Sequence, residues 1–154
     1  MLAARLLPGA VVALYSGKGS EVDTKRLDEV LRVRGMTIVY PRVIGDGQLL
    51  AFHAVTLDDL VAARFGLREP RPDAAAVEIS DIAAFVVPGL AFDRAGWRIG
   101  WGRGHYDATF ATASPSALRV GLAFECQLVD QVAREPHDVA LHVILTQLST
   151  YMVA

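Results

Sequence analysis

The sequence predicts an α/β protein with a layered, mostly parallel sheet and flanking helices. Apolar segments that suit strands alternate with helical segments along the chain, which is the order expected for a parallel sheet. Hydrophobic residues make up 53% of the 154 residues and charged residues only 21%, as expected for strands covered on both faces. The length suits one domain with its own core, so we expect residues 1–154 to form a single domain.

The first half of the chain is predicted to alternate strands and helices between glycine and proline breaks. Gly35 ends the first helix, Pro41 stops the second strand, and the Gly45-Asp46-Gly47 turn separates it from the third. Thr56 or Asp58 caps a short second helix. In chain order we expect a strand over 11–15, a helix over 23–33, strands over 36–40 and 48–55, a helix ending at 65, and a proline-rich surface loop over 68–72.

The second half begins with an apolar strand and continues into a glycine-rich segment. Residues 82–87 suit a buried strand because all six are apolar. In chain order we expect a strand over 82–87, a glycine-rich loop, a helix from 105 to 113, a strand over 118–124, a polar helical turn, and a last strand over 139–146.

Composition excludes several classes of protein and of site. A net charge of −2 and a pI near 6.0 provide no general field for nucleic acid, so we expect no nucleic-acid partner. No apolar run approaches the roughly 20 residues that span a bilayer, so we expect no membrane partner. The start resembles a short signal peptide with Arg5 as its charge, but residues 11–15 suit a core strand, and we expect a cytoplasmic protein. Cys126 is the only cysteine, which excludes an internal disulfide.

The segment 88–107 is the strongest functional signal, and it suits a phosphate-binding loop. Its glycines allow backbone N–H groups to approach an anion, and Arg98 and Arg103 add positive charge. The loop lies between a predicted strand and a predicted helix, where phosphates commonly bind. Glycine-rich loops also form turns that bind nothing, and the spacing matches neither common nucleotide fingerprint. Trp97, Trp101 and Tyr106 either stack on a flat heterocycle or anchor the core.

Three acids near predicted strand ends are candidates for chemistry. Asp107 directly follows the glycine loop, where it is either a magnesium ligand beside phosphates or an acid in the first turn of a helix. Asp138 precedes the last predicted strand and is either a second magnesium ligand or an ordinary structural acid. Glu21 follows the first strand, where ligands gather in parallel sheets, or is a solvated loop charge. His105 either contacts phosphate or a ring, or is polar surface.

Several stretches together resemble the 5-formyltetrahydrofolate cyclo-ligase family, also called methenyltetrahydrofolate synthetase. They are Glu21-Val-Asp-Thr, Phe65-Gly-Leu-Arg-Glu-Pro, the block from Val87 to Asp107, Gly121 to Gln127, and Pro136-His-Asp-Val. The resemblance implies the fold of ribose-phosphate isomerases and coenzyme A transferases, the NagB/RpiA/CoA transferase-like type. It also implies an enzyme that uses ATP and Mg²⁺ to close 5-formyltetrahydrofolate to 5,10-methenyltetrahydrofolate, with release of ADP and phosphate.

The resemblance also implies roles for individual residues. Arg103 and Glu21 would be catalytic, and Asp107 and Asp138 would hold magnesium. The implied nucleotide-binding residues are Arg98, Ile99, Gly100, Trp101, Gly102, Arg103, Gly104, His105 and Tyr106. The implied folate-binding residues are Glu21, Phe52, Trp101, Gly102, Arg103, Gly104 and His105.

Three differences from the family pattern leave a second hypothesis open. We expect the chain to lack the family's N-terminal helix, which carries a lysine and an arginine that reach ATP. His105-Tyr106 replaces a pair of tyrosines, and Leu141-His142 stands where the family often has an acid. The alternative is therefore a degenerate member that binds folate or nucleotide without turnover. A sugar-phosphate isomerase of the same fold is a weaker third possibility. The oligomeric state is left open.

Overall fold

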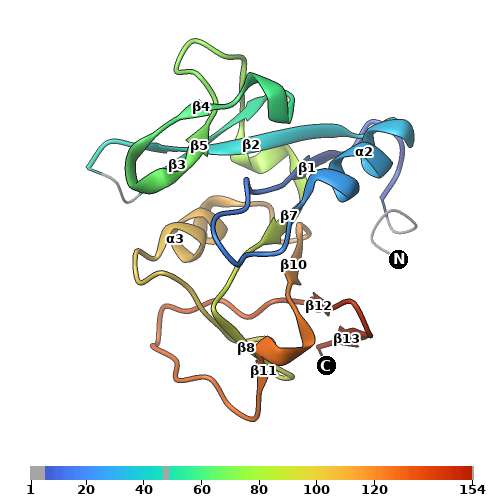
Figure 1. Ribbon diagram of the computed structural model, residues 1–154, viewed down its shortest axis with the longest axis vertical. Helices are drawn as coiled ribbons and strands as arrows, with labels where there is room; N and C mark the ends of the chain where they lie inside the picture. Colours follow the sequence, from blue (N-terminus) through green and yellow to red (C-terminus); the bar gives the residue numbers. More distant parts are fainter. Residues whose placement is uncertain (1–5, 47–48, 154) are drawn as a thin grey trace.

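The computed structural model describes residues 6–46 and 49–153, and its centre is an eight-stranded sheet (Figure 1). Arg5, Gly47 and Gln48, which figure in the sequence predictions, lie outside the described residues. The strand order is β13-β12-β10-β7-β1-β2-β3-β6. The bounds are β1 Val11–Ala13, β2 Thr37–Ile44, β3 Leu49–Ala54, β6 Ala76–Val77, β7 Ile82–Val87, β10 Leu118–Leu122, β12 Val143–Leu145 and β13 Thr150–Met152.

The five central strands, from β12 to β2, are parallel, and antiparallel strands flank them at both edges. The predicted α/β class with a mostly parallel sheet is confirmed. β7 alternates between two cores: Ala84 and Val86 face one, and Ile82, Phe85 and Val87 face the other. Burial on both faces explains why this strand is a continuous apolar run in the sequence.

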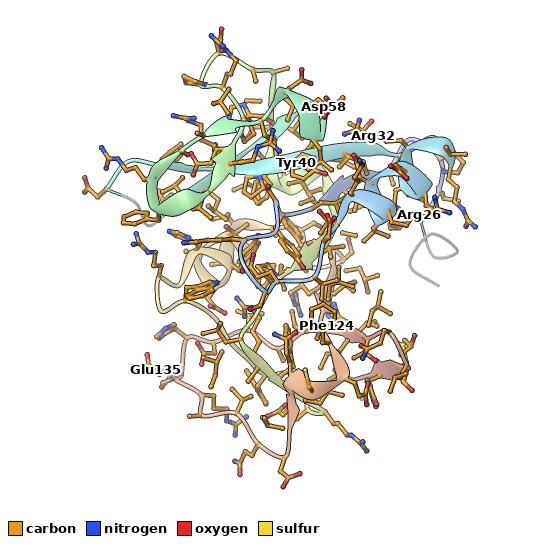
Figure 2. The ribbon with its side chains drawn as sticks, viewed as in Figure 1. Arg26, Arg32, Tyr40, Asp58, Phe124 and Glu135 are labelled. Carbon is orange, nitrogen blue, oxygen red and sulfur yellow. The ribbon has the colours of Figure 1, made fainter. Side chains whose placement is uncertain are left out.

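Each core is covered by one helix. Leu31 of α2 (Lys25–Val33) belongs to the first core, and Phe110 of α3 (His105–Thr112) belongs to the second. Gly35 adopts φ +79° just after α2, as expected for a glycine that ends a helix. Arg32 of α2 binds Asp28 at 2.6 Å and the carbonyl of Val55 at 2.6 Å, which ties the helix to the end of β3 (Figure 2). None of the helices in the described ranges is long and apolar enough to span a membrane.

The prediction that the second strand stops at Pro41 is wrong, because β2 continues to Ile44. The Val39 carbonyl accepts a hydrogen bond from Leu14, so the polar backbone groups of residues 39, 41 and 43 point away from β3. Beyond this Leu14 bond, the chain that follows β1 no longer pairs with that side of β2. Pro41 therefore gives up no ladder bond, as at an edge strand.

The prediction of a helix ending at Phe65 is also wrong. The Asp59 carboxylate accepts hydrogen bonds from both the backbone and the hydroxyl of Thr56, which closes a single turn, and the chain then turns back as a hairpin. The observed elements are η1 Leu57–Asp59, β4 Val61–Ala62, η2 Arg64–Gly66 and β5 Arg68–Glu69, with β4 antiparallel to β5. Glu69 is buried and accepts a hydrogen bond from the backbone of Val43, which holds the hairpin against β2.

Short elements make up the rest of the chain. The predicted last strand over 139–146 shortens to β12, and β13 follows it although the sequence did not indicate it. The predicted polar turn is η4 Glu125–Gln127, and η3 Ile79–Asp81 precedes β7. Within and after the glycine-rich segment, β8 Ala91–Asp93, β9 Arg98–Ile99 and β11 Leu128–Val129 form a small sheet of order β11-β8-β9. This small sheet carries the glycine loop.

Candidate functional site

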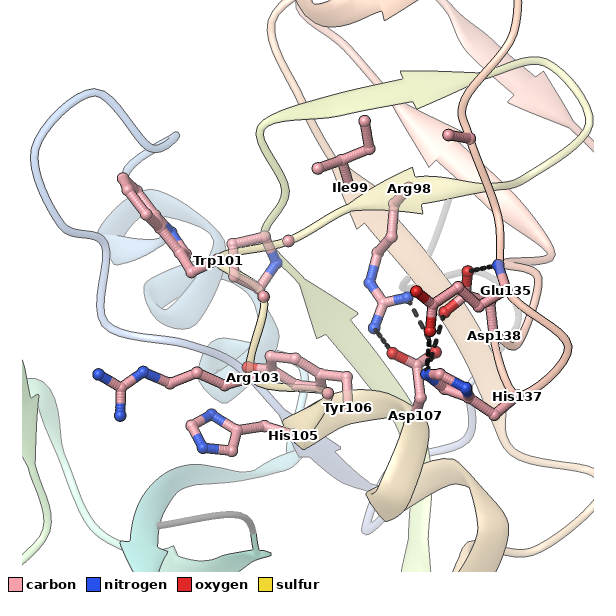
Figure 3. Close-up of a pocket in the computed structure, with 15 residues that line it drawn as sticks. Arg98, Ile99, Trp101, Arg103, His105, Tyr106, Asp107, Glu135, His137 and Asp138 are labelled. Carbon is pink, nitrogen blue, oxygen red and sulfur yellow. Dashed lines mark hydrogen bonds and ion pairs between the residues drawn. The ribbon is translucent and has the colours of Figure 1, made fainter.

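A pocket of about 340 Å³ lies where β9, the glycine loop, the start of α3 and the segment 133–138 meet (Figure 3). Pro88 lines it directly after β7. The loop that follows the adjacent parallel strand β1 carries Glu21, which bonds to the glycine loop. The site therefore forms at the carboxyl ends of neighbouring parallel strands, where α/β proteins bind ligands.

The glycine loop, residues 100–104, is open on the side where a ligand would approach. A Cβ atom placed on Gly100, Gly102 or Gly104 would meet no atom within 4 Å. Gly102 and Gly104 have φ angles of +80° and +64°, in the left-handed region that glycine adopts easily. Gly104 is the N-cap of α3, so the first N–H groups of the helix are directed at this end of the pocket. The backbone can therefore approach a phosphate closely.

Arg98 and Asp107 form a largely buried ion pair beside the loop. The two Arg98 Nη atoms lie 3.4 and 3.2 Å from the two Asp107 carboxylate oxygens, and the side chains are 7% and 13% exposed. Asp107 also accepts a hydrogen bond from the backbone N–H of Val139 at 3.0 Å. The carboxylate is thus fixed between β9, α3 and the segment that precedes β12. In this geometry the Arg98 fork faces Asp107.

Asp138 supplies the second carboxylate of the pocket. Its Oδ2 accepts the backbone N–H of Glu135 at 2.7 Å, while its Oδ1 lies 3.8 Å from Nε2 of His137. The same imidazole nitrogen lies 3.4 Å from Oε2 of Glu135. In the described ranges no three histidine, cysteine or acidic side chains gather closely enough to hold a metal by themselves. Such a sparse set fits Mg²⁺, which needs one or two protein carboxylates and takes its other ligands from phosphate and water.

Glu21 meets the glycine loop through Trp101. Its Oε1 accepts a hydrogen bond from the indole Nε1–H at 2.9 Å, and its Oε2 accepts one from the backbone N–H of Lys18 at 2.8 Å. The Lys18 ammonium lies 5.8 Å from the centre of the indole ring. Burial, together with the nearby Glu21 carboxylate, raises the pKa of Tyr15, which donates to the carbonyl of Val22. These contacts tie the β1–α2 loop to the glycine loop where it faces the site.

The structure brings nearly all the predicted site residues together. All nine residues predicted to bind nucleotide, 98–106, line one pocket with Asp107 and Asp138. Burial raises the pKa of the Tyr106 phenol above its ordinary value. Glu21 does not line the pocket but bonds to a residue that does. Sequence reasoning missed Glu135 and His137, whose place in a short turn with Asp138 was the available signal.

Phe52 lies apart from this group. Its side chain is 1% exposed in the core, where its ring packs edge-on against Phe85 at 5.7 Å. His142, one of the family differences, also lies outside the pocket lining. Its two ring nitrogens lie 3.0 Å from the backbone nitrogen and 2.8 Å from a guanidinium nitrogen of Arg119. That difference therefore alters a contact between strands and leaves the pocket lining unchanged.

Comparison with known proteins gives consistent results. A family model described as the 5-formyltetrahydrofolate cyclo-ligase family matches residues 5–147. A 5-formyltetrahydrofolate cyclo-ligase from Mycolicibacterium smegmatis is 35% identical over an alignment of 145 residues that covers 91% of this chain and 75% of the relative. The Escherichia coli K12 protein with that name is 32% identical over an alignment of 139 residues that covers 88% of this chain and 76% of the relative.

Solved structures agree on the fold. The structure of Aquifex aeolicus 5,10-methenyltetrahydrofolate synthetase has a TM-score of 0.76 at 26% identity, covering 95% of this chain and 72% of that one. A 5,10-methenyltetrahydrofolate synthetase from Mycoplasma pneumoniae has a TM-score of 0.70 at 26% identity, covering 93% of this chain and 78% of that one.

Proposed function

This chain belongs to the 5-formyltetrahydrofolate cyclo-ligase family, and we propose that the pocket around the glycine loop is where it performs the family's reaction. The chain is an ATP-dependent ligase that closes 5-formyltetrahydrofolate to 5,10-methenyltetrahydrofolate. The observation that supports the proposed site is that one pocket joins an open, cationic glycine loop to two carboxylates, Asp107 and Asp138. Among the described residues no feature favours binding without turnover over catalysis.

The nucleotide phosphates would lie along the glycine loop. Backbone N–H groups of the loop and of the first turn of α3 would donate to phosphate oxygens, helped by the positive end of the helix. Arg103, which is exposed in the middle of the loop, would supply a positive charge for the terminal phosphate. Arg98 would act mainly by holding Asp107, because its guanidinium already pairs with that carboxylate.

Asp107 and Asp138 would hold Mg²⁺ between the protein and the phosphates. Asp107 is oriented by Arg98 and Val139, and Asp138 by the backbone of Glu135. Bound there, Mg²⁺ would neutralise phosphate charge and orient the terminal phosphoryl group for transfer. Without that cation, two carboxylates would repel the nucleotide, since like charges meet in a half-enclosed pocket.

The folate would bind on the Glu21 side of the loop. There the formyl oxygen attacks the terminal phosphorus of ATP, and the bond to ADP breaks. The neighbouring folate nitrogen then attacks the formyl carbon and loses its proton to solvent, and phosphate leaves with the former formyl oxygen. Positioning and charge neutralisation carry both steps, so Arg103 and the loop N–H groups would stabilise the transferred group. Glu21, Trp101 and His105 would orient the folate, and Phe52 would support that pocket from the core.

A direct assay tests this function. Folded protein mixed with ATP, Mg²⁺ and 5-formyltetrahydrofolate is expected to develop the absorbance band of the methenyl product. Asp138→Asn should lower kcat/KM by at least about a hundredfold because a charged ligand is lost. The control is Asp130→Asn, which removes an exposed acid outside the pocket lining and should behave as wild type. Folded wild-type protein that gives no methenyl product contradicts the proposal.

We also propose a cytoplasmic enzyme formed by one domain, since reducing conditions suit its lone cysteine.

A further inference from the structure

Phe65 has two features that neither the fold nor the pocket requires. It is the one non-glycine residue of the described ranges with positive φ, at φ 62° and ψ 23°. Its side chain is 59% exposed, although a phenyl ring gains free energy by leaving water. A left-handed conformation is an outlier for a bulky residue, because the Cβ crowds the backbone. Glycine or asparagine would form this turn between β4 and β5 with less strain.

The ring of Phe65 reaches across to the glycine loop. The guanidinium carbon of Arg103 lies 4.0 Å from the ring centroid, which is close stacking for an arginine and an aromatic ring. Arg103 stands between Gly102 and Gly104, whose positive φ angles and open surroundings leave the backbone unpacked. The place of the guanidinium therefore depends on its side-chain contact.

We propose that Phe65 is a positioning residue that holds Arg103 where it meets the terminal phosphate of ATP. The strained turn directs the ring at the guanidinium, and strain of this kind persists where the geometry serves a site. The inference rests on the proposed function only for the phosphate role of Arg103. Phe65 itself lies outside the pocket lining and acts through the arginine.

Limited trypsin digestion tests the anchoring without any ligand. Phe65→Leu removes the ring, and Phe65→Asn removes it while suiting the left-handed backbone. Both variants should be cleaved after Arg103 about fivefold faster than wild type, with Phe65→Tyr unchanged. Cleavage after Arg134, which stacks on Trp97 at 4.8 Å, is the internal reference and should not change. The Tm of Phe65→Asn should equal or exceed that of wild type, because strain is relieved.

A nucleotide-binding experiment tests the role of the contact. Wild type should bind a nonhydrolysable ATP analogue more tightly than ADP, and Phe65→Leu and Phe65→Asn should lose about tenfold in that preference while ADP affinity is unchanged. A merely structural effect would weaken the binding of the ATP analogue and of ADP equally. The matched control is Phe124→Leu, another partly exposed ring, which lies in the lower half of the molecule, away from β4 and β5 (Figure 2).

Three results would overturn the inference: unchanged cleavage after Arg103 in Phe65→Leu, equal acceleration after Arg134, or an unchanged preference for the ATP analogue. Failure of the proposed function is a separate result. In that case wild type makes no methenyl product, while the trypsin arm still decides whether Phe65 anchors Arg103.

Discussion

Trp101 links two loops that lie 80 positions apart in the sequence, through its indole N–H and the Glu21 carboxylate. Trp101→Phe keeps an aromatic ring beside Lys18 but removes the donor, so Glu21 loses one of its two fixed contacts. Because the carboxylate is charged and the contact is exposed, we expect the KM for 5-formyltetrahydrofolate to rise about three- to tenfold. Steady-state kinetics measure this, with Trp97→Phe as the control. Equal KM values in the two variants would refute the role of Trp101.

Arg98 pairs with Asp107 where both side chains are largely removed from water. Arg98→Met leaves Asp107 charged and buried with the backbone of Val139 as a remaining donor, so we expect a loss of about 3 kcal/mol in the free energy of unfolding. Arg98→Lys should lose less of the free energy of unfolding than Arg98→Met does, because it keeps a positive charge beside Asp107. The double variant Arg98→Met/Asp107→Asn should be less destabilised than the sum of the single changes, because no unpaired charge remains. Urea unfolding measures wild type, Arg98→Met, Arg98→Lys, Asp107→Asn and the double variant. Additive effects would contradict a direct pair.

At the scale of an element, alanine substitutions are expected to differ between Gly100 of the glycine loop and Gly96 before that loop, because only Gly96 is closely packed. Gly100 does not have a positive φ, and a Cβ there would meet nothing within 4 Å, so Gly100→Ala should leave stability within about 0.5 kcal/mol of wild type. If phosphates lie against this backbone, the added methyl group should still weaken ATP binding about tenfold, or 1.4 kcal/mol. Calorimetric titration measures the affinity. Unchanged ATP affinity would mean that the phosphates lie elsewhere.

Gly96 is the matched contrast. Its φ is +87°, and a Cβ there would lie 2.6 Å from the backbone carbonyl oxygen of Leu141. Gly96→Ala should therefore destabilise the fold by more than about 2 kcal/mol, because strain and a clash with backbone combine. Thermal unfolding distinguishes the two glycines. A stable Gly96→Ala protein would show that this close approach is not needed.

Elements with a regular apolar pattern could be predicted from the sequence, and elements fixed by single tertiary contacts could not. The continuous apolar run of β7 and the glycine-terminated α2 are local signals, and both were found where expected. β2 passes through Pro41 because of where its neighbour β1 ends, which no local pattern records. The hairpin at 61–69 depends on Glu69, a buried acid that bonds to β2, 26 positions earlier in the sequence.

The residues of the candidate site also divide into those that a local sequence pattern indicates and those that only tertiary contacts bring in. Asp107, Asp138 and the loop 98–106 could be predicted because their residue types stand in a recognisable local order. The ion pair of Arg98, the bond from Trp101 to Glu21 and the stacking of Phe65 could not, since each joins segments that only the folded sheet brings together. Such contacts between loops decide how a ligand-binding surface is held.

For the molecule as a whole, the pairing of β10 with β12 makes stability depend on pH. Arg119 of β10 donates its backbone N–H to Nδ1 of His142, just before β12, and its guanidinium lies 2.8 Å from Nε2 of the same ring. Burial first, and then the positive charge of Arg119, lower the pKa of His142, and burial also lowers that of Arg119. The unfolded chain therefore takes up a proton below about pH 6.5 that the folded chain does not. The stability that neutral His142 contributes is complete above about pH 6.5 and is lost as the pH falls through the pKa of His142 in the folded chain.

His142→Asn should remove this dependence. The free energy of unfolding of wild type should fall between about pH 7 and pH 5, and that of the variant should fall less steeply in the same window. Glu125 titrates in a lower window, because hydrogen bonds from Thr146 and Tyr151 lower its pKa and its contribution is lost only on further acidification. Urea unfolding at a series of pH values separates the two groups. Parallel curves for wild type and His142→Asn would show that the pair with Arg119 does not control the stability of the sheet.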